Sequence, residues 1–398
     1  MIRIQADAAR QSGKDRNATL LFDLVRRLAP ISRAELAKTS GLSPATVTVL
    51  VDELLQGGWL VELGVSVSEE RRGRRPVNLA INARRGAVAT LEITGGGYIL
   101  SVYDICLGKL AQLRSSRMAQ ESEPVIRQLR TQLEALSLAD AQLLGIHVLY
   151  PGLFDRESGR LGFSAVIENW RKSSPTLLRD LREAFASARV MLSNSAAATA
   201  YSAFVHDMRE PPLPLLVMTI QEGIDAGVIL PGGQSIPVEA GHISIDRCGP
   251  LCNCGNRGCL ETFCSATALL ARLKAAGFTP DCEVPDGVEP LDAQLRQIAK
   301  AFSDGDAAVR SCLHAYARDL DCALVSLVNL LGVRAVRLGG LPQQLGSPFL
   351  LLLQRTLRQE FHVLTASQQL DLQLFDCRAE DVRQAAVMQT LQAIFSRT

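Results

Sequence analysis

One imidazole and a group of thiols lie close together between Glu239 and Glu261, where the chain reads EAGHISIDRCGPLCNCGNRGCLE. Three thiols and one imidazole form a ligand set that tetrahedral structural zinc prefers. Gly255 and Gly258 stand where the backbone must reverse so that two thiols reach one ion. The segment therefore predicts a structural zinc site with one ion per chain, and the expected ligands are His242, Cys252, Cys254 and Cys259.

The fourth ligand has an alternative, because Cys248 lies close enough in the sequence to replace His242. Either set is a closed site with four protein ligands, which leaves no position for a reactive water and disfavours a zinc-dependent hydrolase. The other cysteines are expected to act as small apolar residues in a reducing compartment. They are Cys106, Cys264, Cys282, Cys312, Cys322 and Cys377.

Charge is distributed unevenly along the 398 residues, although the formal net charge is only +1. Residues 1–85 carry 14 Lys+Arg against 9 Asp+Glu, which gives +5, and the remainder carries 28 against 32, which gives −4. A basic N-terminal segment favours contact with nucleic acid. No apolar run reaches the roughly 18 residues that span a bilayer, and the polar start does not resemble a signal peptide. We therefore expect a cytoplasmic protein without membrane contact.

Residues 1–82 predict a winged helix-turn-helix domain. Apolar residues recur at helical spacing over residues 17–29, and Pro30 ends this helix. Ser32 and Glu35 form a capping box that opens a second helix, which Gly41 ends with a turn. Two short helices joined at a glycine are typical of the helix-turn-helix motif.

The third helix is the predicted DNA-recognition helix. Ser43 is its expected cap and Pro44 its first residue, and its buried stripe is expected to be Val47, Leu50, Val51 and Leu54. Ala45, Val49 and Asp52 should face outward, flanked by Thr46 and Thr48. Because the N-terminal part of such a helix usually faces the major groove, we predict a set of DNA contacts there. They are Ser43, Ala45, Thr46, Thr48 and Val49.

A wing is predicted from two strands, Trp59–Leu63 and Pro76–Ile81, and from the loop between them. Arginines on such a loop suit contact with phosphates or with the minor groove, where the negative potential is strong. The arginines of this loop, which surround Gly73, are Arg71, Arg72, Arg74 and Arg75. The alternative is a helical packing domain with a charged loop, but cap, turn, third helix and wing follow one another in the order of a DNA-binding domain.

The body, residues 83–398, predicts an α/β fold with two lobes. A β-β-β-α-β-α order of elements appears twice along it, which indicates two similar lobes with a cleft between them. Lobe 1 is expected at about residues 83–205, and lobe 2, with the metal segment, at about residues 206–398.

The sequence EAGH at 239–242, followed by CNCGNRGCLE at 252–261, resembles the signature of the ROK family (repressors, open reading frames and sugar kinases). RAELAKTSGLSPATV at 33–47 and GRRP at 73–76 resemble the regulator branch of that family, the xylose-repressor-like and N-acetylglucosamine-repressor-like proteins. The resemblance covers almost the whole chain. It implies an actin-like, hexokinase-type body, a structural zinc, and a homodimer or homotetramer.

The resemblance also implies a sugar site. The family holds sugar hydroxyls with acidic and imidazole groups near the zinc, and the matching residues here are Glu239, His242 and Glu261. Asn194 matches the asparagine that opens the family's Asn-Asp sugar-contact pair. Carboxylates accept paired hydrogen bonds from vicinal diols, which suits this role. In the alternative reading the two glutamates only orient the zinc ligands. The implied effector is a sugar or sugar phosphate, with a protein partner as the alternative.

Phosphoryl transfer is disfavoured by three departures from the kinase pattern. Ser195 follows Asn194 where a kinase has an aspartate as general base. The first phosphate loop reads EITGG at 92–96, and the second, QEGIDAG at 221–227, contains two acidic residues where phosphates approach. Gly339 and Gly340 alone keep the pattern of a nucleotide-contacting turn.

We therefore predict a DNA-binding transcriptional regulator, a repressor of carbohydrate genes, that is not an enzyme. The alternative is an ATP-dependent ROK sugar kinase that carries a DNA-binding module. The predicted partners are an operator in double-stranded DNA and a sugar or sugar phosphate.

Overall fold

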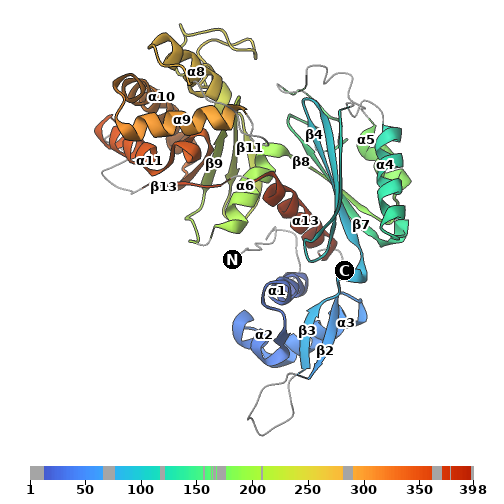
Figure 1. Cartoon of the computed structure of the whole chain (residues 1–398). Coiled ribbons are helices and arrows are strands. Elements are labelled where there is room, and N and C mark those ends of the chain that lie inside the picture. Colours follow the sequence, from blue (N-terminus) through green and yellow to red (C-terminus); the bar gives the residue numbers. More distant parts are fainter. Residues whose placement is uncertain are drawn as a thin grey trace. The chain divides into compact units, whose positions relative to one another are not determined.

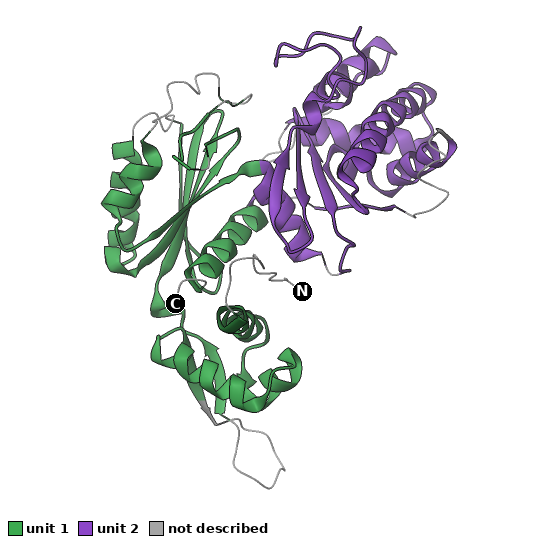
Figure 2. Cartoon of the chain, turned by 180° about the vertical axis from the view of Figure 1, so that it is seen from behind, with its two compact units in different colours: residues 1–195, 380–398 green, residues 196–379 purple. Residues whose placement is uncertain are grey.

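The chain forms two compact units, unit 1 (Met1–Ser195 and Glu380–Thr398) and unit 2 (Ala196–Ala379), which Figure 2 shows in different colours. The computed structural model describes residues 13–65, 77–116, 122–155, 157–162, 164, 167, 176–207, 209–280, 290–360, 370–376 and 378–395. No described helix is both long and apolar enough to cross a membrane.

Unit 1 begins with a small domain, here called the head (residues 13–65 and 77–82). Its elements are α1 (Gly13–Leu28), β1 (Ile31–Ser32), α2 (Arg33–Ser40), α3 (Pro44–Gln56), β2 (Leu60–Val65) and β3 (Val77–Ile81), and its sheet order is β1-β3-β2. The predicted capping box is present, because Ser32 and Glu35 satisfy each other's backbone amides. Gly41 has a φ of 71°, a left-handed conformation that ends α2 and makes the predicted turn.

Helix α3 packs its apolar stripe into the head as expected. Val47, Leu50, Val51 and Leu54 are all at most 4 % exposed. The Ser43 side chain accepts a hydrogen bond from the backbone amide of Thr46, which confirms the predicted cap. The four arginines of the predicted wing lie outside the described residues. Strand β1 is a feature that the sequence did not predict.

The rest of unit 1 is a five-stranded sheet with helices on both faces (Figure 1). Its elements are β4 (Ala87–Thr94), β5 (Gly97–Asp104), β6 (Lys109–Ser115), α4 (Ser122–Ala135), β7 (Leu143–Tyr150), α5 (Leu177–Ala184), β8 (Arg189–Asn194) and α13 (Ala379–Phe395). The order is β6-β5-β4-β7-β8, with an antiparallel meander followed by parallel pairs. Helices α4 and α5 supply apolar residues to the core on one face, and α13 lies on the other.

Unit 2 repeats this sheet topology. Its elements are α6 (Ser195–His206), β9 (Leu215–Ile220), β10 (Ile224–Ile229), β11 (Ser235–Val238), α7 (Glu261–Cys264), α8 (Ala266–Ala275), α9 (Pro290–Asp304), α10 (Ala307–Leu331), β12 (Ala335–Gly340), α11 (Leu341–Glu360) and β13 (Asp371–Leu374). The order β11-β10-β9-β12-β13 again combines a meander with two parallel pairs. The repeated order predicted from the sequence is therefore confirmed, and the fold is α/β.

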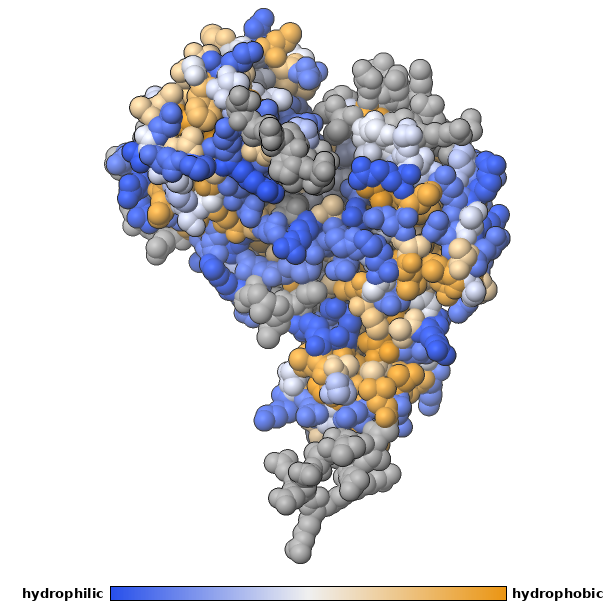
Figure 3. Space-filling view, in the orientation of Figure 1, coloured by the Kyte–Doolittle hydropathy of each residue, from blue (hydrophilic) through white to orange (hydrophobic). Residues whose placement is uncertain are grey.

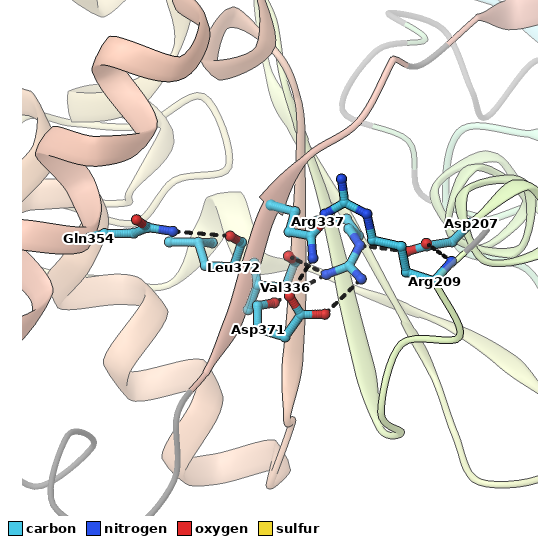
Figure 4. Close-up of polar contacts among 8 residues, drawn as sticks. Asp207, Arg209, Val336, Arg337, Gln354, Asp371 and Leu372 are labelled. Atoms are coloured by element: carbon cyan, nitrogen blue, oxygen red, sulfur yellow. Dashed lines mark hydrogen bonds and ion pairs between the residues drawn. The ribbon is translucent and has the colours of Figure 1, made fainter.

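A buried arginine joins three parts of unit 2 (Figure 4). Arg337 of β12 is only 2 % exposed. Its Nε donates to Asp207 at 2.7 Å and its Nη2 donates to Asp371 at 2.8 Å. Asp207 follows α6 and Asp371 begins β13, so the charge of Arg337 is compensated where both segments meet the sheet.

Helix α13 joins the head to the sheet of unit 1. The ring centroid of Phe395 lies 4.8 Å from that of Phe22 and 4.6 Å from that of Trp59 in the head. Val387 and Met388 belong to the same apolar cluster as the core of the head. The second lobe predicted from the sequence, at about residues 206–398, includes α13, whereas the contacts group residues 380–395 with unit 1 (Figure 2).

Candidate functional site

A tight loop in unit 2 positions the predicted metal ligands. A single 3₁₀ turn, Ala240–His242, carries the imidazole, and a short antiparallel pairing carries the thiols. Gly255 and Gly258 have φ values of 93° and 67°, the left-handed region that favours glycine. A Cβ at Gly258 would lie 1.5 Å from the carbonyl oxygen of Asp246, so a side chain there would block the loop. Both glycines therefore make the predicted reversals.

The loop brings four ligand atoms together. One ligand atom each from His242, Cys252, Cys254 and Cys259 lies within 4.8 Å of all the others. The Sγ atoms of Cys254 and Cys259 are 3.6 Å apart, and His242 Nδ1 lies 3.7 Å from Cys252 Sγ. Two thiolates on tetrahedral zinc lie about 3.8 Å apart, because each Zn–S bond is about 2.3 Å. The cluster fits a metal of this kind, and Cys248, which is exposed, is not part of it.

The buried thiols of this cluster resist ionisation without a cation. Burial raises the pKa of Cys252, and burial together with the neighbouring thiols raises the pKa of Cys259 to about 12. A metal binds thiolates, so binding must displace these protons.

Two glutamates lie directly beside the cluster. Glu261 is two residues after Cys259, and its Oε2 accepts a hydrogen bond from the backbone amide of Ile224 at 3.1 Å. Glu239 immediately precedes the 3₁₀ turn that carries His242 and is exposed. The structure thus brings Glu239, His242 and Glu261 into one region of unit 2.

Asp225 also belongs to this region, although the sequence did not predict it as a site residue. Although Asp225 is exposed at the surface, desolvation by the protein packed around its carboxyl group raises its pKa, and the charges of Glu239 and Glu261 raise this pKa further. The only signal in the sequence was the acidic character of the loop at 221–227. Three carboxylates therefore act on one another beside the imidazole of His242.

Asn194 lies in unit 1, whereas the other predicted sugar contacts lie in unit 2. It ends β8 and is 6 % exposed. Its Nδ2 donates to the carbonyl oxygen of Gly152 at 2.9 Å, which fixes the amide group.

The first phosphate loop contains an ion pair that the sequence did not reveal. Glu92 Oε2 lies 2.6 Å from Arg383 Nη1, and Arg383 Nη2 lies 3.4 Å from Glu380. The partners Glu92 and Arg383 are 291 positions apart. The carboxylate of Glu92 is therefore already paired with a cation of this chain.

The glycines at 339–340 are explained by packing. Gly340 has a φ of 71°, and a Cβ there would lie 2.2 Å from the carbonyl oxygen of Ile220. A Cβ at Gly339 would lie 2.6 Å from the ring of Phe375. Close contact within unit 2 therefore requires both glycines.

The outward side of α3 is exposed as predicted. Val49 is 54 % exposed, and Ser43, Ala45 and Thr48 are exposed as well. Thr46 is half-buried. Their contact with DNA stays a prediction, as does that of the arginines at 71, 72, 74 and 75.

Curated relatives match most of this chain. It is 28 % identical to a putative xylose repressor from Caldicellulosiruptor sp. (strain Rt8B.4), over 86 % of this chain and 87 % of the relative. It is 30 % identical to the xylose repressor of Bacillus subtilis, over 65 % of this chain and 68 % of the relative. The DNA-binding transcriptional dual regulator NagC of Escherichia coli is 26 % identical, over 82 % of this chain and 80 % of the relative.

Solved structures share the fold. A ROK family transcriptional regulator, a homologue of the E. coli protein MLC, aligns with a TM-score of 0.71 at 24 % identity, covering 96 % of this chain and 98 % of its own. The ROK hexokinase from Thermus thermophilus aligns with a TM-score of 0.56 at 22 % identity, covering 76 % of this chain and 97 % of its own. The sequence model of the ROK family matches residues 93–368, more than half of the chain. The chain therefore belongs to the ROK family.

Proposed function

We propose that this chain is a DNA-binding transcriptional repressor of carbohydrate genes that responds to a sugar or sugar phosphate. The observation that carries the proposal is the helix-turn-helix geometry of α2, Gly41 and α3 in one chain with a ROK body. Relatives that match over at least four fifths of their length are named as a xylose repressor and as a DNA-binding transcriptional dual regulator. The match to the hexokinase structure covers only 76 % of this chain, so this chain has an additional part, of about the size of the head, that the hexokinase lacks.

The body is a sensor and not a sugar kinase. Ser195 is a neutral hydroxyl at the position of the kinase base, and it cannot accept a proton at neutral pH without a base of its own. Glu92 is ion-paired with Arg383. Glu222 and Asp225 place acidic groups in the second phosphate loop, where a nucleotide phosphate would need positive charge or backbone amides. These three features support a regulator over the kinase alternative.

The DNA-binding part is the head within residues 1–82, with α3 in the major groove and the arginine-rich wing on the backbone or minor groove. We propose that the protein is cytoplasmic. We also propose that it is a homodimer or homotetramer, because operator symmetry commonly mirrors protein symmetry.

The Cys₃His cluster would hold one structural zinc ion per chain. A metal there ties the 3₁₀ turn, Ala240–His242, to the thiol loop, and so fixes the side chains beside it. Four protein ligands leave no open position, so the role is structural.

The effector would contact Asn194, Glu239, His242 and Glu261. The His242 Nδ1 faces the thiols, so its Nε2 can donate to a sugar hydroxyl. The carboxylates of Glu239 and Glu261 would accept hydrogen bonds from vicinal hydroxyls, which favours a sugar ring. Only a ligand with different affinity for two conformations can change DNA binding.

Unit 1 offers a route from the Asn194 region to the head. The Ser193 hydroxyl, next to Asn194, lies 2.8 Å from His147 Nε2, and His147 Nδ1 lies 2.9 Å from the Ala386 carbonyl oxygen in α13. The other end of α13 places Phe395 against the head. A change at Asn194 would reach the head through this helix.

Three measurements test the proposal on the full-length, zinc-loaded protein. Selection from random duplexes should yield a bound operator, and a panel of monosaccharides and their phosphates should include one that raises the unfolding temperature and changes operator affinity. A coupled assay with ATP and hexoses should show no turnover. Absence of DNA binding, or turnover that is lost on Glu92→Gln, would contradict the proposal.

A further inference from the structure

The outward face of α3 carries methyl groups. Residues 45, 48, 49 and 52 share this face because they recur at helical spacing, opposite the buried stripe. Val49 is 54 % exposed, although Val47 and Val51 on the other side are fully buried. Figure 3 shows that hydrophobic residues gather on the visible face of the head.

The hydroxyl groups at the start of α3 already have partners within the helix. Thr48 Oγ1 donates to the carbonyl oxygen of Pro44 at 2.9 Å. The hydroxyl oxygens of Ser43 and Thr46 lie 2.8 Å apart and share a hydrogen bond, and the Ser43 oxygen also accepts from the Thr46 amide. With its hydroxyl directed at its own helix, Thr48 has a methyl group left to present outward.

The remaining polar residues of this face are not placed to form hydrogen bonds with the bases. Asp52 Oδ1 accepts from Arg33 Nη2 of α2 at 2.7 Å, so each charge is compensated by the other. Gln56 is at the C-terminal end of α3, roughly 10 Å along the axis from Val49. The N-terminal part of a recognition helix contacts the bases, and here it offers no free amide, guanidinium or ammonium group.

A thymine C5-methyl is the apolar group among the base edges of the major groove, whereas the other bases present donors and acceptors there. We propose that Val49, with the methyl groups of Ala45 and Thr48, reads thymine C5-methyl groups in each operator half-site. This proposal rests on the DNA-binding function above and adds the chemistry of the base contact. Val49 therefore determines specificity at these base pairs.

The test begins with one duplex obtained from random DNA by selection with the full-length protein. Each thymine of a half-site is replaced singly by uracil, which removes only the C5-methyl group. We expect the affinity of the wild-type protein to fall about fourfold at one or two of these positions. This is the effect expected when one methyl-sized group loses its apolar contact. At these positions a cytosine pair should bind more tightly when the cytosine is 5-methylated.

Val49→Ala should weaken binding to the thymine duplex by a similar factor and should lose the response to uracil. Because Val49 is exposed, this change should leave the fold intact. Leu28→Ala, at another exposed apolar residue of the head, is the matched control and should keep the full response to uracil.

Each outcome separates this inference from the proposed function. If no duplex is selected, DNA binding itself fails, and the inference fails with it. If a duplex binds but no uracil position weakens it, the inference is wrong while the proposed function stands. A uracil response that persists in Val49→Ala also overturns it, because another group then reads the methyl.

Discussion

At the scale of single residues, His147 shows how burial determines a protonation state. The ring is fully buried. The Ala386 carbonyl oxygen can only accept a hydrogen bond, so His147 Nδ1 carries the proton and Nε2 accepts from the Ser193 hydroxyl. Burial lowers the pKa of His147 to about 4. The imidazole is therefore neutral at physiological pH and connects β7, β8 and α13.

This depressed pKa predicts a dependence of unit 1 stability on pH. The unfolded histidine binds a proton below about pH 6.5 while the folded one does not, so the stabilisation is present above that pH and is lost as pH falls toward 4. Between pH 7 and pH 5.5 the free energy of unfolding should fall by about 1 kcal/mol from this residue. His147→Gln should remove that fall.

Tryptophan fluorescence can follow this transition, because Trp59 belongs to unit 1. Denaturant titrations at the two pH values give the free energies. His314→Gln, at an exposed histidine of α10, is the control and should keep the wild-type fall. An equal fall in wild type and His147→Gln would refute the assignment.

The metal cluster gives a second prediction for a single residue. Cys254→Ser should lose most of the bound zinc, and its unfolding midpoint should fall by about 10 °C, the equivalent of roughly 3 kcal/mol in a unit of this size. Elemental analysis and calorimetry measure the two effects. Cys248→Ser is the control and should keep one ion per chain, since Cys248 lies outside the cluster. Zinc retained by Cys254→Ser would contradict the ligand set.

At the scale of elements, α13 joins two surfaces of unit 1. Its first turns place Arg383 on Glu92, and its middle packs closely enough on the sheet that a Cβ at Gly145 would lie 2.4 Å from Thr390. Its last turn carries Phe395 to the aromatic rings of the head. The head thus shares its apolar core with a helix that begins five residues after Leu374, where the last strand of unit 2 ends.

Phe395→Ala should therefore loosen the head. Removal of this buried ring should cost roughly 3 kcal/mol of unfolding free energy, because a cavity remains between Phe22 and Trp59. The fluorescence of Trp59 reports the change during denaturant unfolding. Leu351→Ala, at an exposed residue of α11, should change stability by less than about 0.5 kcal/mol. Equal stability of the two variants would argue against this shared core.

Local patterns were predictable from the sequence, and distant contacts were not. The Ser32 capping box and the left-handed Gly41 depend on residues a few positions apart, so the sequence shows them directly. The Cys₃His cluster spans eighteen residues and has a distinctive composition. The pairing of Glu92 with Arg383 depends on the path of the whole chain, and no local signal marks it.

At the scale of the whole molecule, the chain contains two units whose five-stranded sheets have the same topology, and it begins with a basic N-terminal region. Residues 1–85 carry +5, and four of their arginines surround Gly73. Phosphate contacts release condensed counterions, so these arginines should set how steeply operator binding depends on salt.

Replacing both Arg74 and Arg75 by Ala should reduce the slope of log K against log salt concentration by about 2, because two phosphate contacts are lost. Binding should weaken by a similar factor for every duplex. Fluorescence anisotropy at several salt concentrations measures the slope. The variant with Arg179→Ala and Arg182→Ala in α5 has the same loss of charge and should keep the wild-type slope. If the wing variant also keeps it, the wing does not contact phosphates.

The position of α13 has a consequence for how this chain matures on the ribosome. Translation produces the head first and Ala379–Phe395 only after all of unit 2, yet the apolar core of the head includes Leu391 and Phe395. A nascent polypeptide that stalls before residue 379 lacks part of that core. Competence to bind an operator should therefore appear only after unit 2 has been synthesised.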